Sequence, residues 1–113
     1  MLEIQTKHLQ PDIVVVEITG RIKIGKECQQ LEEAVGSLVR EERKKVIFDL
    51  SGVSHIDSMG IREIVLAASQ IKKAGGALRL AGANGHVQQI LKMTHVDQIV
   101  GLRPTMVAAA TGF

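Results

Sequence analysis

The sequence predicts an α/β protein built on a mixed, mostly parallel sheet of four to five strands, with helices packed against it. Short β-branched or apolar runs alternate with segments whose apolar residues recur every three or four positions. Two strands come first, and helices and strands then follow in alternation. This order favours parallel strands that are joined by helical crossovers.

The first two strands are expected to form a hairpin. Residues Leu2–His8 alternate weakly between apolar and polar, and Ile13–Thr19 is a β-branched run typical of a strand. Residues Gln10–Asp12 supply the turn chemistry between them.

A helix is expected after Gly20. Its apolar residues recur at helical spacing and define a buried face: Cys28, Leu31, Val35, Leu38 and Val39. The opposite face, with Glu32, Glu33 and Arg40, is expected to be solvated.

A central strand is expected at Lys45–Leu50. This run is nearly all apolar and is bounded by charges and by Ser51–Gly52, which suits a strand covered on both faces. Because the strand follows a helix, a parallel crossover is the natural connection.

A second long helix is expected from the apolar spacing of Ile61–Ile71. Either Asp57 or Ser58 can cap its start. Lys72–Lys73 occupy its last turn, and Gly75–Gly76 offer a left-handed stop.

The last third of the chain is expected to add two strands and two helices. Ala77–Ala81 is a short strand, and a short helix with an apolar side of Val87, Ile90 and Leu91 opens near Asn84. Val96–Val100 is a further strand candidate, and Pro104 is expected in the first turn of a terminal helix that runs through Ala110. The predicted order is therefore ββαβαβαβα.

Composition describes one ordinary globular domain over residues 1–113, with 45% hydrophobic and 23% charged residues. The formal charge is +2, from 14 basic and 12 acidic residues, and the basic residues are dispersed. A nucleic-acid footprint is more concentrated, and an aromatic content of 2% leaves little to stack on bases, so no nucleic-acid partner is expected.

The cellular setting is expected to be the cytoplasm. The single cysteine, Cys28, cannot form an intramolecular disulfide, and no secretory signal opens the chain. Apolar stretches such as Ile13–Val16 and Val107–Ala110 are far shorter than the roughly 18 residues of a membrane helix, so no direct membrane insertion is expected. Cys28 is expected to be a small core residue and not a reactive thiol.

The segment Gly20–Glu27 nearly spells a phosphate-binding P-loop. The position that would bind magnesium through a hydroxyl is Glu27, whose carboxylate would repel phosphate. Bulky Ile22 and Ile24 also argue against a tight cradle of amides. The segment is therefore interpreted as a strand-to-helix loop, with Arg21 and Lys23 available to face a partner.

Catalytic and metal sites are not indicated, so the protein is predicted not to be an enzyme and to need no cofactor. His55, Asp57 and Ser58 have the residue types of a hydrolase triad, but their spacing does not give its geometry, and Ile56 replaces the first glycine of a nucleophile elbow. The four histidines lack the spacing of common metal sites. His55 is interpreted as a structural residue near a strand end.

The segment Asp57–Gly60 follows the central strand and opens the second helix. A capped helix start is the simple interpretation. A functional one is favoured because Ser54 and Ser58 crowd a loop at the carboxyl end of a central strand, where open α/β sheets present their sites. Apolar Met59, if exposed, would offer a contact to a partner.

Taken in order, these segments resemble the STAS domain of the anti-sigma factor antagonist family. The resemblance covers essentially the whole chain. It depends on four segments: Ile18–Arg21, Val46–Val53, Ile56–Ile61 and Ala74–Gly76. The family often has serine or threonine where this chain has Met59, which leaves Ser58 as the only hydroxyl in the motif.

The resemblance implies a phosphorylation-controlled partner switch. Ser58 would be the phosphoacceptor, and the partners would be an anti-sigma factor that is also a GHKL-type serine kinase and a serine phosphatase. The expected partner-binding residues are Arg21, Lys23, Asp57, Met59, Gly60 and Ile61. A monomer or weak dimer is expected. The alternative is a constitutive STAS interaction module in a stress-signalling complex or beside a transporter.

Overall fold

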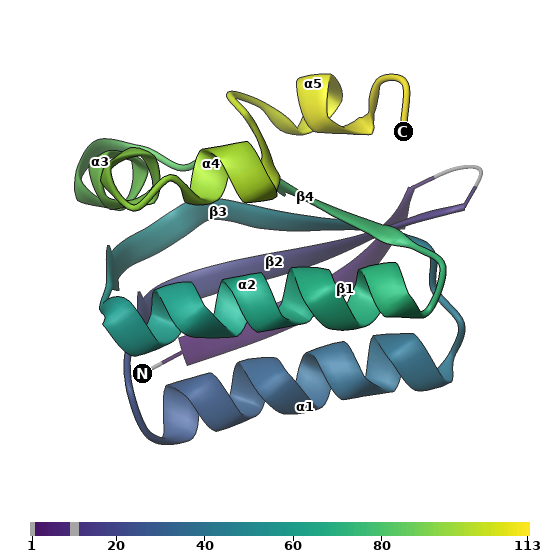
Figure 1. Cartoon of the computed structure of the whole chain (residues 1–113), viewed down its shortest axis with the longest axis horizontal. Coiled ribbons are helices and arrows are strands. Elements are labelled where there is room, and N and C mark those ends of the chain that lie inside the picture. Colours follow the sequence, from purple (N-terminus) through teal and green to yellow (C-terminus); the bar gives the residue numbers. More distant parts are fainter. Residues whose placement is uncertain (1, 10–11) are drawn as a thin grey trace.

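The computed structural model describes residues 2–9 and 12–113 and forms one five-stranded sheet with helices against it (Figure 1). The strands are β1 (Leu2–Leu9), β2 (Ile13–Ile22), β3 (Lys45–Ile56), β4 (Ala77–Ala81) and β5 (Gly101–Arg103). The helices are α1 (Lys26–Arg40), α2 (Ser58–Lys73), α3 (Gly85–Met93), α4 (Val96–Ile99) and α5 (Met106–Ala110).

The strands lie in sequence order across the sheet, β1-β2-β3-β4-β5. Strand β1 is antiparallel to β2, and every later neighbouring pair is parallel. The structure thus confirms the predicted mixed, mostly parallel sheet and its opening hairpin. Gln10 and Pro11 of the expected turn lie outside the described residues.

The two faces of the sheet are covered unequally. Side chains alternate along a strand, so Val14 and Val16 of β2 belong to the large core beneath α1 to α4, whereas Val15 belongs to a small cluster beneath α5. Phe48 is completely buried in the large core. Helices α1 and α2 lie side by side on the well-covered face (Figure 1).

The predicted faces of α1 are confirmed. Cys28, Leu31 and Val35 are buried, and Glu32 lies on the exposed side. Burial raises the pKa of the Cys28 thiol, and nearby carboxylates such as that of Glu63 raise it further. Cys28 therefore remains a neutral thiol that packs as a small apolar group.

The predicted strand at Val96–Val100 is wrong. Val96–Ile99 is helix α4, and the last strand begins at Gly101. Val96 and Val100 are both buried, at a spacing of four residues, whereas Ile99 between them is 64% exposed. This is the burial pattern of a helical turn and not the alternation of a strand.

The terminal helix ends at Ala110 as expected, but Pro104 is not in its first turn. The N-cap is Thr105, whose Oγ1 accepts a hydrogen bond from the Ala108 amide at 3.1 Å. Pro104 precedes this cap, where a residue without an amide hydrogen breaks no helical hydrogen bond.

The expected stop after α2 is confirmed. Gly75 has a φ of +90°, a conformation that glycine adopts without steric penalty. The Gly76 amide donates to the Ile71 carbonyl at 2.9 Å and thereby satisfies one of the last carbonyls of the helix. Strand β4 can therefore begin immediately at Ala77.

Arg79 of β4 holds α5 against the sparsely covered face. Its guanidinium donates to the carbonyls of Ala109, Thr111 and Gly112 at 2.9, 3.0 and 3.1 Å. It also lies 4.3 Å from the centre of the Phe113 ring. The Arg79 guanidinium thus hydrogen-bonds carbonyls that the five-residue helix α5 leaves without partners at its C-terminal end.

We expect Arg79→Lys to lower the free energy of unfolding by about 1–2 kcal/mol, because an ammonium group cannot reproduce the guanidinium fork. Urea denaturation measures this change, and amide exchange should accelerate in residues 106–113 ahead of the rest. Arg103→Lys is the matched control, since Arg103 is exposed and, among the described residues, its guanidinium donates only to the adjacent Leu102 carbonyl. Equal losses in both variants would contradict the anchoring role.

Candidate functional site

Ser58 is the first residue of α2, and the single residue Asp57 separates it from the end of β3 at Ile56. Strand β3 was expected to end at Leu50, but β2 continues to Ile22 and pairs with it as far as Ile56. Ser54 therefore lies in a strand and not in the expected loop, whereas His55 lies near a strand end, as expected. Register shifts in this stretch of the pairing allow the strand to pass the turn-like Ser51–Gly52.

Asp57 joins the start of α2 to the loop between β2 and α1. Its Oδ1 accepts a hydrogen bond from the Gly60 amide at 2.8 Å, and its Oδ2 accepts one from the Ile24 amide at 3.0 Å. Of the two candidate caps, Asp57 is thus the N-cap. Ser58 is exposed, and its hydroxyl has no hydrogen-bond partner among residues 2–9 and 12–113.

Asp57 is held in its ionised form. Partial desolvation of the carboxyl group acts to raise its pKa, but hydrogen bonds from the amides of Ile24, Gly60 and Met59 outweigh it and lower the pKa below the usual aspartate range. The N-terminus of α2 favours the same negative charge. A carboxylate with both oxygens occupied by amides is suited to positioning and not to proton transfer.

Gly60 permits the close approach of α2 to the end of β2. A β-carbon at this position would lie 2.6 Å from the Ile22 carbonyl oxygen and 2.7 Å from Cγ1 of Ile56. Gly60 is buried, so its contribution to any partner contact would be indirect. The close approach that Gly60 allows brings the end of β2, the loop before α1 and Ser58 to one edge of the sheet.

We define the Ser58 surface by five residues at the end of β2, in the loop after it and at the start of α2: Arg21, Lys23, Ile24, Ser58 and Met59. The two basic residues are exposed and Met59 is partly buried. Ile24 is 66% exposed, and its amide bond to Asp57 places it beside the start of α2. Ile61, which was also expected to bind a partner, is partly buried and packs against the core.

Ile24 was not anticipated as a surface contact. The sequence marked it only as too bulky for a phosphate cradle. Its exposure could have been expected from its position between Lys23 and Gly25. An apolar side chain in a loop does not belong to the buried face of a helix or strand. Segment 20–27 is the end of β2, a short loop and the first residues of α1, as expected.

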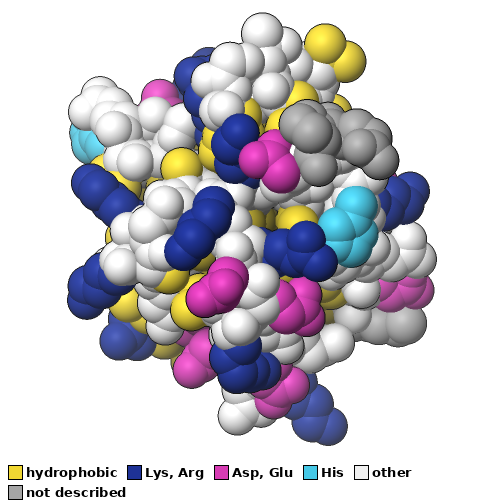
Figure 2. All heavy atoms as spheres, turned by 90° about the vertical axis from the view of Figure 1, so that its right-hand side faces the viewer, with side chains coloured by type: hydrophobic (Ala, Val, Ile, Leu, Met, Phe, Trp, Pro, Cys, Tyr) yellow, Lys and Arg dark blue, Asp and Glu magenta, His cyan; other side chains and the backbone are white. Residues whose placement is uncertain are grey.

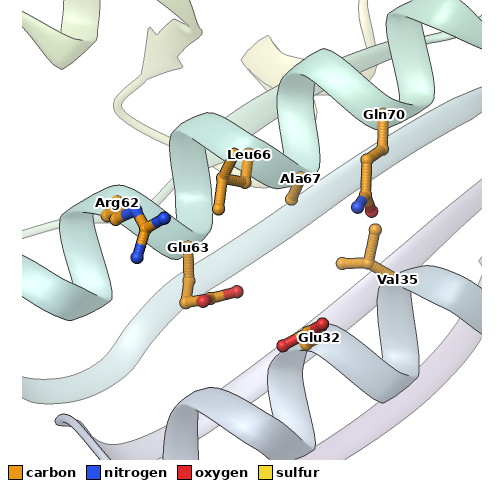
Figure 3. Close-up of a pocket in the computed structure, with 7 residues that line it drawn as sticks. All are labelled: Glu32, Val35, Arg62, Glu63, Leu66, Ala67 and Gln70. Carbon is orange, nitrogen blue, oxygen red and sulfur yellow. The ribbon is translucent and has the colours of Figure 1, made fainter.

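A groove between α1 and α2 is a second recess that the sequence did not indicate. Figure 3 shows the carboxylates of Glu32 and Glu63 turned toward the space between the two helices, which Val35 and Ala67 also line. Burial raises the pKa of Glu63, and the neighbouring Glu32 raises it further, while Arg62 acts in the opposite direction. The groove contains no nucleophile, and its acids are far apart in the sequence.

The edge of the sheet opposite Ser58, where the parallel strands β2 and β3 begin, carries both positive and negative charges. Figure 2 shows Lys and Arg side chains interspersed with Asp and Glu on this side of the molecule. Lys45 Nζ lies 3.2 Å from Asp12 Oδ2, and Arg43 Nε lies 3.6 Å from Glu41 Oε1. This face therefore offers no concentrated positive field of the kind that attracts nucleic acid.

Within residues 2–9 and 12–113, no three or more His, Cys, Asp or Glu side chains are grouped so that they could hold a metal ion. In the same residues no helix combines the length and the apolar character needed to cross a membrane.

The chain belongs to the STAS domain family, because the sequence model of that family matches residues 4–109. It is 28% identical over 86 residues to BtrV of Bordetella bronchiseptica, a candidate anti-sigma factor antagonist, across 76% of this chain and 74% of BtrV.

Solved structures share the fold. An anti-sigma factor antagonist from Mycobacterium paratuberculosis has a TM-score of 0.88 at 22% identity, with 98% of this chain and 92% of that chain covered. The phosphorylated form of the Bacillus cell fate determinant SpoIIAA has a TM-score of 0.68 at 12% identity, covering 89% and 91%. A sulfate transporter family protein from Wolinella succinogenes has a TM-score of 0.77 at 20% identity, covering 91% and 85%.

We expect Asp57→Asn to keep the α2 cap but lose the bond to Ile24, since an amide side chain presents only one oxygen. The cost at neutral pH should be about 1 kcal/mol of unfolding free energy. Because the pKa of Asp57 is lowered on folding, its stabilising contribution is present above about pH 4 and is lost as pH falls through the folded-state value. The difference in unfolding free energy between wild type and variant should therefore become smaller in acid, as urea denaturation at several pH values would measure. A difference that does not change with pH would contradict this account.

We expect Gly60→Ala to lower the free energy of unfolding by about 1–3 kcal/mol, because the added carbon meets the backbone of β2 and not a flexible side chain. Gly36→Ala in α1 is the matched control. Its added carbon would meet only the end of the Arg40 side chain at 3.4 Å, and alanine favours a helix by up to about 1 kcal/mol. Thermal or urea unfolding should give opposite signs for the two variants.

Proposed function

We propose that this protein is an anti-sigma factor antagonist whose binding to an anti-sigma factor is ended by phosphorylation of Ser58. One observation carries the proposal: Asp57 performs the capping of α2, which leaves the exposed Ser58 hydroxyl free of any structural role among the described residues. Membership of the STAS family and the similarity to BtrV support the same function.

Phosphorylation at this position would leave the fold intact. A phosphate group adds about −1.5 to −2 charges at neutral pH. At the first residue of α2, the helix dipole and free amides tolerate negative charge. The Ser58 side chain is exposed, so the added group would extend into solvent and displace no core residue. The modification would therefore act on the surface and not on stability.

Binding would weaken because the Ser58 surface changes character. In the unmodified form it combines the cations of Arg21 and Lys23 with the apolar side chains of Ile24 and Met59. A doubly charged group beside them, next to the ionised Asp57, would have to be desolvated in any contact. A penalty of about 3 kcal/mol corresponds to a loss of affinity of roughly a hundredfold.

In this function the protein is a binding module, not an enzyme. The phosphoryl transfer is carried out by its partners, which we propose to be a GHKL-type serine kinase that is also the anti-sigma factor and a serine phosphatase that restores the hydroxyl. The cycle would take place in the cytoplasm, with the protein as a monomer or weak dimer.

A constitutive interaction module is the second candidate. The fold is shared with a sulfate transporter family protein from Wolinella succinogenes, so a transporter-associated or scaffold role fits the same architecture. In that role Ser58 would remain unmodified, and the Ser58 surface would bind its partner regardless of kinase activity.

We expect mass spectrometry of the protein purified from its native cells to find phosphate on Ser58, with an occupancy that changes under stress. Incorporation of labelled phosphate from ATP by the cognate kinase should be abolished in Ser58→Ala and retained in Ser54→Ala. Ser54 is the matched control, because it is also exposed but donates to the Gly20 carbonyl from within β3. Normal labelling of Ser58→Ala would refute the assignment.

Partner affinity gives the second readout of the same proposal. Ser58→Glu should weaken binding to the anti-sigma factor by at least about tenfold, since a single carboxylate carries less charge than phosphate. Asp57→Asn should also weaken it by releasing the loop that carries Ile24. Binding that survives both changes, without phosphate on Ser58 in cells, would favour the constitutive module.

A further inference from the structure

Two histidines from distant parts of the chain meet at the carboxyl edge of the sheet. His55 is the penultimate residue of β3, and His86 lies in the first turn of α3. Their ring centroids are 5.9 Å apart with an interplanar angle of 52°. Both side chains are exposed, and the proposed partner switch uses neither of them.

The hydrogen bonds around His55 assign its neutral tautomer. The Ser54 hydroxyl donates its only proton to the Gly20 carbonyl, at 3.3 Å. Its oxygen lies 3.0 Å from Nδ1 of His55 and can therefore only accept there, so Nδ1 carries the proton. The Nε2 lone pair then has no hydrogen-bond partner among the residues that the structure describes. Metal-binding histidines are oriented in this way, by donation from the other ring nitrogen to a fixed acceptor.

The separation of the rings fits a shared metal ion. With zinc–nitrogen bonds of about 2.1 Å, each ring centroid lies about 3.2 Å from the ion, and two rings at a tetrahedral angle are about 5.2 Å apart. The observed 5.9 Å exceeds this by less than an ångström, which small side-chain rotations would close. We propose that His55 and His86 form a binding site for a divalent transition-metal ion of the zinc class.

The site would be open and reversible. Within residues 2–9 and 12–113 no third His, Cys, Asp or Glu joins the pair, so water would complete the coordination sphere. Arg21 is the strand neighbour of His55 in the β2–β3 pairing, and its positive charge limits the affinity. Imidazole ligands favour zinc, copper and nickel over magnesium or calcium, which prefer oxygen.

Calorimetric titration of the full chain with zinc chloride tests the proposal. We expect one zinc ion per chain, with affinity reduced at least about tenfold in His55→Asn and in His86→Asn. His8→Asn is the matched control, because His8 is also exposed but lies on β1, and it should bind zinc as the wild type does. Magnesium chloride should give no binding heat.

Two further readouts locate the ion. The imidazole NMR signals of His55 and His86 should shift or broaden with zinc while those of His8 and His95 stay in place. Ser54→Ala should weaken binding by about tenfold, through the lost orientation of His55. Loss of affinity in His8→Asn, equal shifts of all four histidines, or unchanged binding in His86→Asn would overturn the site. Ser58→Ala should bind zinc normally, so this outcome is independent of the partner switch.

Discussion

The carboxylate of Asp57 is the interaction on which the candidate site depends. One oxygen closes the first turn of α2 and the other holds the Ile24 amide, so two connections far apart in sequence are tied to one side chain. The pKa of the group is lowered by the same amides, which shows that the protein favours its charged form. Without it, the loop before α1 would lose this link to the start of α2, and the backbone bond from the Asp57 amide to the Ile22 carbonyl, at 3.2 Å, would remain.

This arrangement separates the residues that set the local geometry from the proposed phosphorylation site. Asp57 and the buried Gly60 set the geometry, and both would tolerate little change without altering the backbone around them. Ser58 lies between them in sequence, yet its hydroxyl contributes nothing to that geometry. A residue that can be modified without unfolding the domain is what a reversible switch requires, because each cycle must return the same structure.

Helices cover both faces of the sheet, so the proposed partner contacts fall at one of its edges. Helices α1 to α4 close one face with a large aliphatic core, while the short α5 covers the other through Arg79 and a small cluster that includes Ala109. The edge that carries Ser58 is formed by strand ends and loops, which rigid elements on both sides position. The paired histidines lie at the same edge of the sheet as the end of β3, so this edge gathers polar groups from several distant segments.

The sequence by itself determined the sheet class, the hairpin and both long helices, because each depends on local periodicity and on turn and cap residues. It failed where tertiary pairing overrode local signals. Strand β3 passes through Ser51–Gly52 because β2 continues beside it, and Val96–Ile99 is helical because Val96 and Val100 are both buried at a four-residue spacing. The sequence left open whether Asp57 or Ser58 is the cap because both side chains can cap a helix, and in the structure Asp57 accepts from the Gly60 amide three residues on. Only the tertiary structure decided that Ile24 lies beside Asp57 and that His55 meets His86. These two contacts join residues about 30 positions apart, and no local pattern encodes a distance between segments that the fold alone brings together.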